Sequence, residues 1–355
     1  MLSMRGYIVK NLKEMVKIES ESEGPMDEII KFTTDLLDDM NLDYEVIKGE
    51  GFDPVIVASY GKGGVCFSGH LDTVPIGDGW KYKQGEIVDE KIYGRGTLDM
   101  KGPCMSLIAA AKKMLDKNIP FSLIFTTDEE VNMFGAKAVA DRTEVIDAPA
   151  VVVCEPTAMQ VVTQEKGVYQ FEIKTDGENA HASMPQKGDN AIVKMLPILK
   201  SLNLKNNIPP ADDEISCCVD VIEGGKATNV IPNSCRAEVD VRFPPHFNKE
   251  ILKKYLFDPI DEKFELNEIQ YLDPAEVDKD NPAVQKLIEV ADAPTWSVPY
   301  GTEMVRFCQA NENTMIFGPG RVDVAHQPNE FIEISELVKV VDIYVDYAET
   351  MASND

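Results

Sequence analysis

The first 160 residues alternate between two spacings of apolar positions. Apolar residues three and four positions apart predict helices over 27–40 and 105–115. Short continuous apolar runs predict buried strands over 65–68, 121–126 and 150–154. Because strands and helices alternate, this part of the chain predicts a mostly parallel sheet with helices on both faces.

The pattern changes in the middle of the chain. Residues 169–174 and 235–242 alternate apolar and polar positions, which is typical of antiparallel strands with one solvent-exposed face. Helical spacing falls between these strands, over 190–202, and after them, over 248–255. Helices on one face of such a sheet form a small α+β domain, which we expect to span residues 166–272.

The first pattern then returns, with a predicted helix over 282–290, a strand over 314–317 and a closing helix over 334–348. A chain of 355 residues also exceeds what one hydrophobic core usually supports. The predicted fold class is therefore α/β. A larger domain, formed by residues 1–165 and 273–355, is interrupted by the smaller α+β domain.

Three of the predicted strands end in an acid or a histidine. His70 follows the strand over 65–68, Glu129 and Glu130 follow the second strand, and Glu155 follows the third. In open α/β sheets, ligands bind outside the carboxyl ends of the strands. The sequence therefore predicts one site at one edge of one sheet.

Composition excludes several classes of partner. A formal charge of −26 argues against binding to nucleic acid or to an anionic membrane. No apolar run reaches about 18 residues, and charged residues interrupt the apolar positions of residues 1–18, so we expect neither a membrane span nor a signal peptide. Seven cysteines without a CxxC pair favour reduced thiols in the cytoplasm over a disulfide framework.

A glycine-rich stretch over 93–102 places Asp99 just before a predicted helix. Glycine has no Cβ, so the backbone there can approach something bound. Asp99 alone indicates little, but together with the acids and imidazoles elsewhere in the chain it suggests a metal site. The candidate metal ligands are His70, Asp99, Glu130, Glu155 and His326. Two imidazoles and three carboxylates suit zinc, and also cobalt or manganese, in sites that keep a position open for water. Two ions that share Asp99 are expected to lie about 3.5–4 Å apart.

Each of these residues alone also fits a simpler interpretation. His70 and Asp72, two positions apart at a strand end, are as a pair better explained as neighbouring surface residues. Glu129 and Glu130 alone fit a solvated turn. At a metal centre, by contrast, Asp72 can orient His70. One of the two glutamates can then bind metal while its neighbour takes a proton from water, whose pKa a bound metal lowers to about 7.

Five segments together resemble the co-catalytic zinc aminoacylase/carboxypeptidase family, which includes acetylornithine deacetylases, succinyl-diaminopimelate desuccinylases, glutamate carboxypeptidases and dipeptidases. They are residues 68–75, 94–102, 128–130, 155–157 and the segment through His326. The resemblance runs from about residue 60 to residue 345. It implies a zinc-peptidase α/β domain with an inserted lid domain that usually forms a homodimer.

The resemblance implies a role for each matching residue. One zinc ion is expected on His70, Asp99 and Glu155, and the other on Asp99, Glu130 and His326. Glu129 matches the general base of the family, and Asp72 matches its orienting acid.

Three lid residues match family positions as well. His181 matches a histidine that helps hold the tetrahedral oxyanion and often reaches into the site of the partner subunit. Asn229 and Arg242 match residues that grip the substrate carboxylate, and the guanidinium fork of arginine suits bidentate binding. The alternative for Arg242 is an outward-facing strand residue. His246 falls in no motif and is expected at the surface.

Residues 300–303, 318–320 and 325–330 most resemble acetylornithine deacetylases. In this segment Gly301 and Glu303 are the candidate substrate-binding residues, and the Glu303 carboxylate could pair with a cationic tail such as the ammonium of ornithine. The expected reaction is hydrolysis of an N-acyl amino acid in arginine biosynthesis. A succinyl-diaminopimelate desuccinylase or a dipeptidase shares all the metal residues and differs in pocket shape. A non-catalytic relative is expected to have lost a ligand or the base, and this chain keeps them all.

Overall fold

The computed structural model describes residues 2–49, 51–142, 146–202 and 213–352. Its internal contacts divide the chain into two units, each of which is described by itself. The first consists of Met1–Thr163, Val277–Trp296 and Thr302–Asp355, and the second of Gln164–Glu276 and Ser297–Gly301.

The first unit is built on a mixed sheet that is parallel at its centre. Along the sheet the strands are β1 (Tyr44–Gly49), β2 (Phe52–Tyr60), β6 (Phe121–Thr126), β3 (Val65–His70), β7 (Val151–Val153), β15 (Thr314–Ile316) and β8 (Val161–Glu165). The pairs β3–β6, β3–β7 and β7–β15 are parallel, whereas β1, β2 and β8 join antiparallel. The predicted parallel sheet is confirmed, and antiparallel strands flank it.

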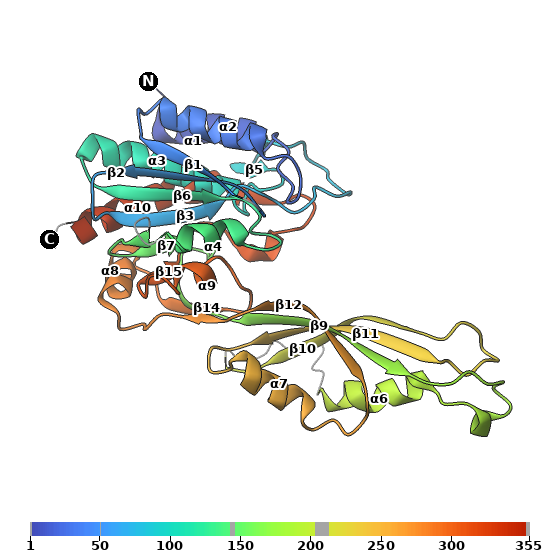
Figure 1. The fold of residues 1–355 in the computed structure, drawn as a ribbon. Helices are drawn as coiled ribbons and strands as arrows, with labels where there is room; N and C mark the ends of the chain where they lie inside the picture. The colour runs from blue at the N-terminus through green and yellow to red at the C-terminus, as the bar shows by residue number, and fades with distance from the viewer. Residues whose placement is uncertain (1, 50, 143–145, 203–212, 353–355) are drawn as a thin grey trace. The chain divides into compact units, whose positions relative to one another are not determined.

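Helices cover both faces of this sheet (Figure 1). They are α1 (Met4–Met15), α2 (Asp27–Asp38), α3 (Lys101–Lys117), α4 (Phe134–Ala140), α8 (Pro282–Ala291), α9 (Met304–Phe307) and α10 (Ile334–Ala352). The connection β3–α3–β6 steps one way along the sheet, and β6–α4–β7 steps back across β3. Because such crossovers are right-handed, α3 and α4 lie on opposite faces. Helices α1 and α10 pack against α3, and α4 packs against β2 and α9.

Gly69 allows the end of β3 to approach the start of α3, and Gly102 allows the start of α3 to approach the loop before it. A Cβ on Gly69 would lie 2.6 Å from Met100 Cε and 2.8 Å from Cys104 Sγ. A Cβ on Gly102 would lie 2.0 Å from the carbonyl oxygen of Thr97. At Gly102 the clash is with backbone, so only glycine fits, whereas a side chain at Gly69 would require the Met100 and Cys104 side chains to shift. The close approach places His70, the last residue of β3, beside the loop that carries Asp99.

A second, three-stranded sheet in the first unit holds that loop. Strand β5 (Lys91–Tyr93) pairs antiparallel with β4 (Glu86–Val88) on one side and β16 (Phe331–Glu333) on the other. A short 3₁₀ helix, η2 (Val322–Val324), precedes β16. The pairing of β5 with β16 brings the segment after His326 next to the stretch that leads to Asp99.

The second unit contains a separate antiparallel sheet. Its strands are β10 (Ser216–Gly224), β11 (Ser234–Phe243), β9 (Gly167–Asp176) and β12 (Glu265–Leu272), in that order. Helices α6 (Ala191–Ser201) and α7 (Lys249–Phe257) begin at Asn190 and Asn248, whose side chains accept hydrogen bonds from backbone amides of the first turn. Shorter elements are η1 (Pro185–Lys187), β13 (Ala275–Glu276) and β14 (Thr295–Val298), the last of which lies partly in each unit.

Apolar side chains from the strands and helices of the second unit form one core. Tyr169 and Phe171 of β9 and Val239 of β11 are buried with Met195 of α6 and Leu252 of α7. The α+β pattern expected for this part of the chain is therefore present.

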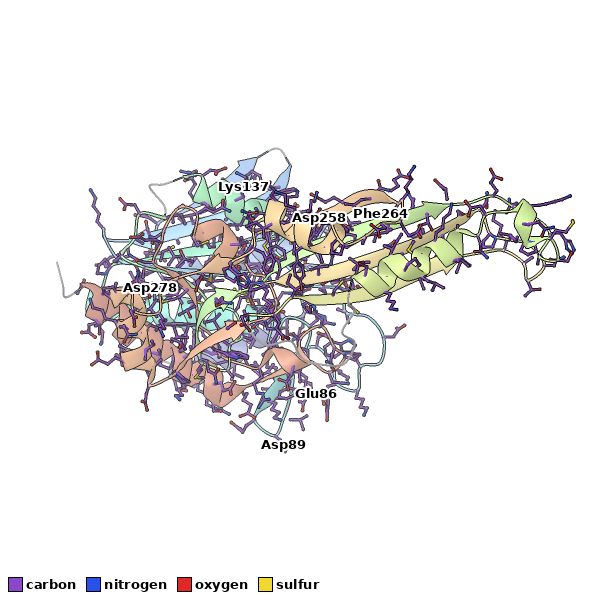
Figure 2. All side chains as sticks on the ribbon, turned by 90° about the horizontal axis from the view of Figure 1, so that it is seen from below. Glu86, Asp89, Lys137, Asp258, Phe264 and Asp278 are labelled. Atoms are coloured by element: carbon purple, nitrogen blue, oxygen red, sulfur yellow. The ribbon has the colours of Figure 1, made fainter. Side chains whose placement is uncertain are left out.

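Asp89, Asp258 and Asp278 are among the acidic residues exposed at the surface (Figure 2). All seven cysteines lie among the described residues as thiols. Cys217 is buried and Cys218 is exposed, as strand alternation requires. His246 is exposed, as expected. Among the described residues, no helix has the length and apolar character that crossing a membrane requires.

Candidate metal centre

Three adjacent parallel strands bring their C-terminal residues to one edge of the first sheet. His70 ends β3, Glu129 and Glu130 follow β6 in the loop before α4, and Glu155 follows β7. Asp99 lies between β5 and α3, joined to Met100 by a cis peptide bond. The structure brings all these side chains together, and the imidazole of His326 joins them from the loop after η2.

Asp99 lies between the two imidazoles. Its Oδ1 is 3.1 Å from His70 Nε2, and its Oδ2 is 3.2 Å from His326 Nε2. Each carboxylate oxygen therefore faces a different histidine. A carboxylate that bridges two metal ions requires the same arrangement.

The remaining donors divide between the two histidines. Glu155 Oε1 is 3.4 Å from His70 Nε2, and Glu130 Oε1 is 3.1 Å from His326 Nε2. Ligand atoms of a tetrahedral metal with bonds of about 2.0–2.1 Å are themselves about 3.3–3.4 Å apart. The pairwise distances thus suit two ions with Asp99 between them.

Compact triplets of donors include Glu129 and leave out His326. His70, Asp99 and Glu130 have one donor atom each within 4.8 Å of one another, and so do His70, Glu129 and Glu155. The pairwise distances separate the two histidines and include His326, so the ligand assignment follows them.

Burial makes this cluster of acids costly without a cation. Burial raises the pKa of Glu129 well above its ordinary value and raises that of Glu155, which is also close to Asp99, to about 7. Burial by itself would lower the pKa of His70, but Glu155, Asp72 and Asp99 outweigh it and raise that pKa well above 6.5. In the described part of the chain, the ion pairs of these carboxylates are with imidazoles and not with lysine or arginine. The donor set therefore fits divalent metal ions.

A second layer of hydrogen bonds orients His70. Its Nδ1 lies 2.9 Å from the backbone oxygen of Asp72 and 3.4 Å from Asp72 Oδ1, which leaves Nε2 facing the cluster. Asp72 Oδ2 accepts hydrogen bonds from Ser22 Oγ at 2.6 Å and from the Glu130 amide at 3.2 Å. Sequence reasoning missed Ser22, because no spacing relates it to Asp72, which lies fifty residues later.

Glu129 lies beside the donors and not among the closest contacts. Its Oε2 is 3.9 Å from His70 Nε2, farther than the oxygens of Asp99 and Glu155. The side chain is 10% exposed. This position suits a carboxylate that handles a proton next to the metal ligands.

Glu303, which was expected near a substrate, lies in the interior, where the charges of His70 and Glu155 act on its carboxyl. Glu303 is 1% exposed, and Ser68 Oγ donates a hydrogen bond to Glu303 Oε2 at 3.3 Å. Burial raises the pKa of this carboxyl to about 8. Contact between Glu303 and a substrate stays a prediction.

The other predicted site residues belong to the second unit and fall into two groups. His181 forms an isolated β-bridge with Val230, and the Ala182 amide donates to the Asn229 carbonyl at 3.0 Å. The His181 ring is exposed, and its Nδ1 lies 2.8 Å from Ser183 Oγ. His181 and Asn229 therefore lie on neighbouring segments.

Arg242 and Gly301 form the second group. Arg242 lies near the far end of β11, where it pairs with Val168, and a Cβ on Gly301 would lie 3.7 Å from Val168 Cγ2. The Arg242 guanidinium donates to both carboxylate oxygens of Asp240, at 2.7 and 2.9 Å. Ser234, at the Asn229 end of β11, precedes Arg242 by eight residues, which corresponds to about 26 Å of strand.

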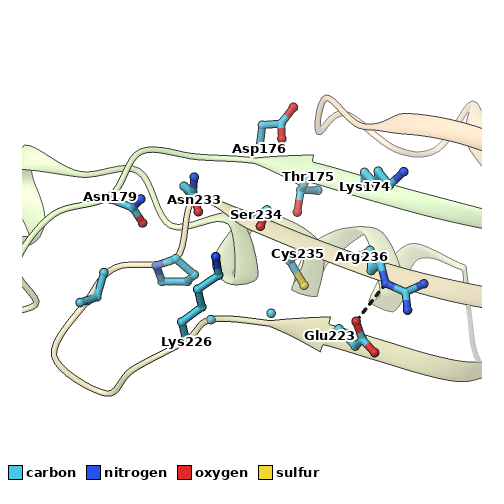
Figure 3. Close-up of a pocket in the computed structure, with 14 residues that line it drawn as sticks. Lys174, Thr175, Asp176, Asn179, Glu223, Lys226, Asn233, Ser234, Cys235 and Arg236 are labelled. Carbon is cyan, nitrogen blue, oxygen red and sulfur yellow. Dashed lines mark hydrogen bonds and ion pairs between the residues drawn. The ribbon is translucent and has the colours of Figure 1, made fainter.

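A cavity of about 570 Å³ opens near the first group (Figure 3). Lys174, Asn179, Lys226 and Asn233 contribute polar groups to its lining, and Arg236 pairs with Glu223 at its edge. It is formed by the ends of β9, β10 and β11 together with the loop that carries Asn229.

Comparison with known proteins agrees with this geometry. A probable succinyl-diaminopimelate desuccinylase of Staphylococcus epidermidis is 27% identical over 393 residues, covering 95% of this chain and 96% of the relative. An acetylornithine deacetylase of Aliivibrio salmonicida is 31% identical over 304 residues, covering 80% of each chain.

Solved structures show the same fold. The aminopeptidase PepT of Bacillus cereus superposes with a TM-score of 0.82 at 20% identity, covering 99% of this chain and 100% of the other. The Bacillus subtilis protein YXEP, described as a dinuclear metal-binding peptidase, superposes with a TM-score of 0.74 at 15% identity, covering 99% of each chain. The model of peptidase family M20/M25/M40 matches residues 66–350, so the chain belongs to that family of metallopeptidases and amide hydrolases.

Proposed function

We propose that this chain removes the acyl group of an N-acyl amino acid, and that its substrate is N-acetyl-L-ornithine, which it hydrolyses to L-ornithine and acetate in arginine biosynthesis. The observation that carries the proposal is the position of Asp99, whose two oxygens each face a different imidazole. The seven thiols support a cytoplasmic location as part of the proposal.

Two zinc ions are the proposed cofactors, with cobalt or manganese as substitutes. One would be held by His70, Asp99 and Glu155, and the other by Asp99, Glu130 and His326. When bound, such ions polarise the scissile carbonyl and lower the pKa of water to about 7.

The chain's own groups handle the protons and position the ligands. Glu129 takes a proton from the attacking water and gives it to the leaving amine, as general base and then general acid. Asp72 and Ser22 keep His70 oriented with Nε2 toward the cluster.

Lid residues are proposed to bind the substrate, in a homodimer. His181 would stabilise the oxyanion, while Asn229, Arg242 and Gly301 would contact the amino-acid part. His181 and Arg242 lie at opposite ends of strands that span about 26 Å, far more than one acetylornithine. If both contact the same substrate, two copies of the chain must contribute them.

An exposed apolar face on the second unit supports this dimer. Val193 and Leu196 on α6 are 59% and 57% exposed, and Ile222 on the edge strand β10 is 53% exposed. Ile192 of α6 reaches Gly224 of β10, so helix and strand form one surface. Exposed apolar patches of this kind mark interaction sites.

Leu196→Asp is expected to convert the dimer to a monomer, because it places a charge in the proposed interface. Light scattering after size exclusion measures the mass, and the monomer is expected to lose most of its activity. Ile251→Asp, at a 48% exposed position on α7, is the matched control and should remain dimeric. Wild-type protein that elutes as a monomer with full activity would contradict the dimer.

Glu303→Gln addresses the choice of substrate. If the Glu303 carboxyl recognises the ammonium of ornithine, the ratio of kcat/KM for acetylornithine over acetylmethionine should fall at least about tenfold. A role confined to the interior, through Ser68 and the charges of His70 and Glu155, would instead change both rates by the same factor.

Metal analysis and a substrate panel test the proposed function. Purified protein should contain two zinc ions per chain and hydrolyse acetylornithine faster than succinyl-diaminopimelate or dipeptides. The relatives named as desuccinylases cover 95% of this chain, which makes succinyl-diaminopimelate the second candidate. Faster turnover of that compound would replace the proposed substrate, and a protein that neither binds metal nor cleaves any of them would sink the proposal.

A further inference from the structure

We infer that the buried ion pair between Arg95 and Glu330 is a positioning element of the metal centre. It holds the backbone amides of Leu98 and Asp99, and it joins the loop that carries Asp99 to the segment that carries His326. The inference rests on the proposed function, because it concerns the geometry of the proposed bridging carboxylate.

Glu330 accepts four hydrogen bonds from one loop. Its side chain is fully buried, and Oε1 accepts from the amides of Leu98 at 2.9 Å and Asp99 at 3.2 Å. Oε2 pairs with Arg95 Nη1 at 2.5 Å, and the backbone oxygen accepts from the Gly94 amide at 3.0 Å. Glu330 therefore contacts both ends of the loop from Gly94 to Asp99.

The same residue lies close in sequence to the other half of the centre. Glu330 follows His326 by four positions, and β16 begins at the next residue, where Phe331 pairs with Tyr93 of β5. The two loops that place Asp99 between the histidines are thus joined by the hydrogen bonds of Glu330 in addition to the pairing of β5 with β16. If Glu330 shifts, the distance between Asp99 and His326 changes with it.

Arg95 connects this point to a third segment. It is 4% exposed, and its Nε donates to the Pro75 carbonyl at 3.3 Å while Nη2 lies 3.5 Å from the Ile76 carbonyl. The Trp80 ring lies 5.6 Å from the guanidinium carbon. Only arginine offers a planar fork that pairs with a carboxylate and still donates to backbone carbonyls. The strand-end segment after Asp72 is therefore attached to the same pair.

Besides its ion pair with Arg95, Glu330 accepts hydrogen bonds from the backbone amides of Leu98 and Asp99. If the ion pair only stabilises the fold, its loss should lower the unfolding temperature without affecting metal binding. If the pair positions the backbone of the bridging ligand, its loss should change the affinity for a bound ion and the ligand field of that ion. These two roles can be separated by experiment.

Glu330→Gln is the test variant. An amide has one acceptor oxygen, so either the Leu98 and Asp99 amides or the Arg95 guanidinium must face an NH₂ group. The apo-protein is titrated with Co²⁺, and affinity and the visible absorption of the bound cobalt are recorded. We expect affinity to fall about 10- to 100-fold, as for loss of partners behind metal ligands, together with a changed absorption spectrum.

Tyr347→Phe is the control for destabilisation. It removes a buried hydrogen bond to the Ala283 carbonyl, at 3.0 Å, from a hydroxyl on α10 that takes no part in the cluster. It should lower the unfolding temperature and leave cobalt affinity and spectrum unchanged. Wild-type cobalt binding in Glu330→Gln would overturn the inference.

Arg95→Lys decides the matter if Glu330→Gln does not fold. Lysine keeps the charge but loses the fork, so a smaller loss of cobalt affinity with the same direction of spectral change is expected. Wild-type binding in this variant would then overturn the inference. Failure of the wild-type protein to bind cobalt at all would instead refute the proposed function, so the two failures are distinct.

Discussion

Asp99→Ala is expected to abolish the binding of both metal ions and to lower turnover by more than about 10⁴-fold. Of the carboxylates that the structure describes, Asp99 alone has an ion pair with both His70 and His326, so its removal takes one ligand from both proposed ion sites. Metal content after dialysis and kcat for acetylornithine are the measurements. Removing Glu155 or Glu130, in comparison, should weaken one site and leave the other.

Asp89→Ala is the matched control. It makes the same chemical change at an exposed position between β4 and β5, and it should keep two ions and full turnover. Two ions retained by Asp99→Ala would show that Asp99 does not bridge, and the assignment of the ligand sets would have to be abandoned.

The edge of the sheet where the donors meet could be predicted from the sequence. His70 and Glu155 each follow a short apolar run, and parallel strands place such ends together. Asp99 and His326 entered the ligand set by residue type, but their assignment to particular ions came from resemblance, because no local pattern relates loops that are more than two hundred residues apart.

The contacts behind the donors could not be predicted in this way. Glu330 stood within a motif that resembles the family, but its hydrogen bonds go to the backbone amides of Leu98 and Asp99. Every residue except proline has such an amide, so the sequence carries no signal for it. The hydrogen bond that Ser22 donates to Asp72 could not be predicted for a similar reason, because serine is common in loops.

Two features of the proposed substrate residues can be read from the sequence. Arg242 lies at the end of the alternating run 235–242, whereas Asn229 precedes that run, so the rise of a strand already separates them. Glu303 is followed by Met304, Val305 and Phe307, all of which are buried, and this apolar surrounding indicated an interior position.

Glu129→Gln is expected to keep both metal ions while turnover falls about 10²- to 10⁴-fold, the range for loss of a general acid–base group. Glutamine has nearly the same shape and cannot take a proton at any pH, so binding and packing are preserved while proton transfer is lost. The 3.9 Å separation of Glu129 Oε2 from His70 Nε2 places the change next to the ligands and not among the closest of them. Metal analysis, KM and kcat for acetylornithine should be measured on the same preparation.

Glu130→Gln separates the two neighbouring roles, because the same substitution one residue later changes a proposed ligand. Its carboxylate lies 3.1 Å from His326 Nε2, so this variant should lose affinity for the ion on the His326 side. Added zinc should then restore part of the activity of Glu130→Gln and none of the activity of Glu129→Gln. Near wild-type turnover in Glu129→Gln, or rescue of that variant by zinc, would assign proton transfer to a different group in the cluster.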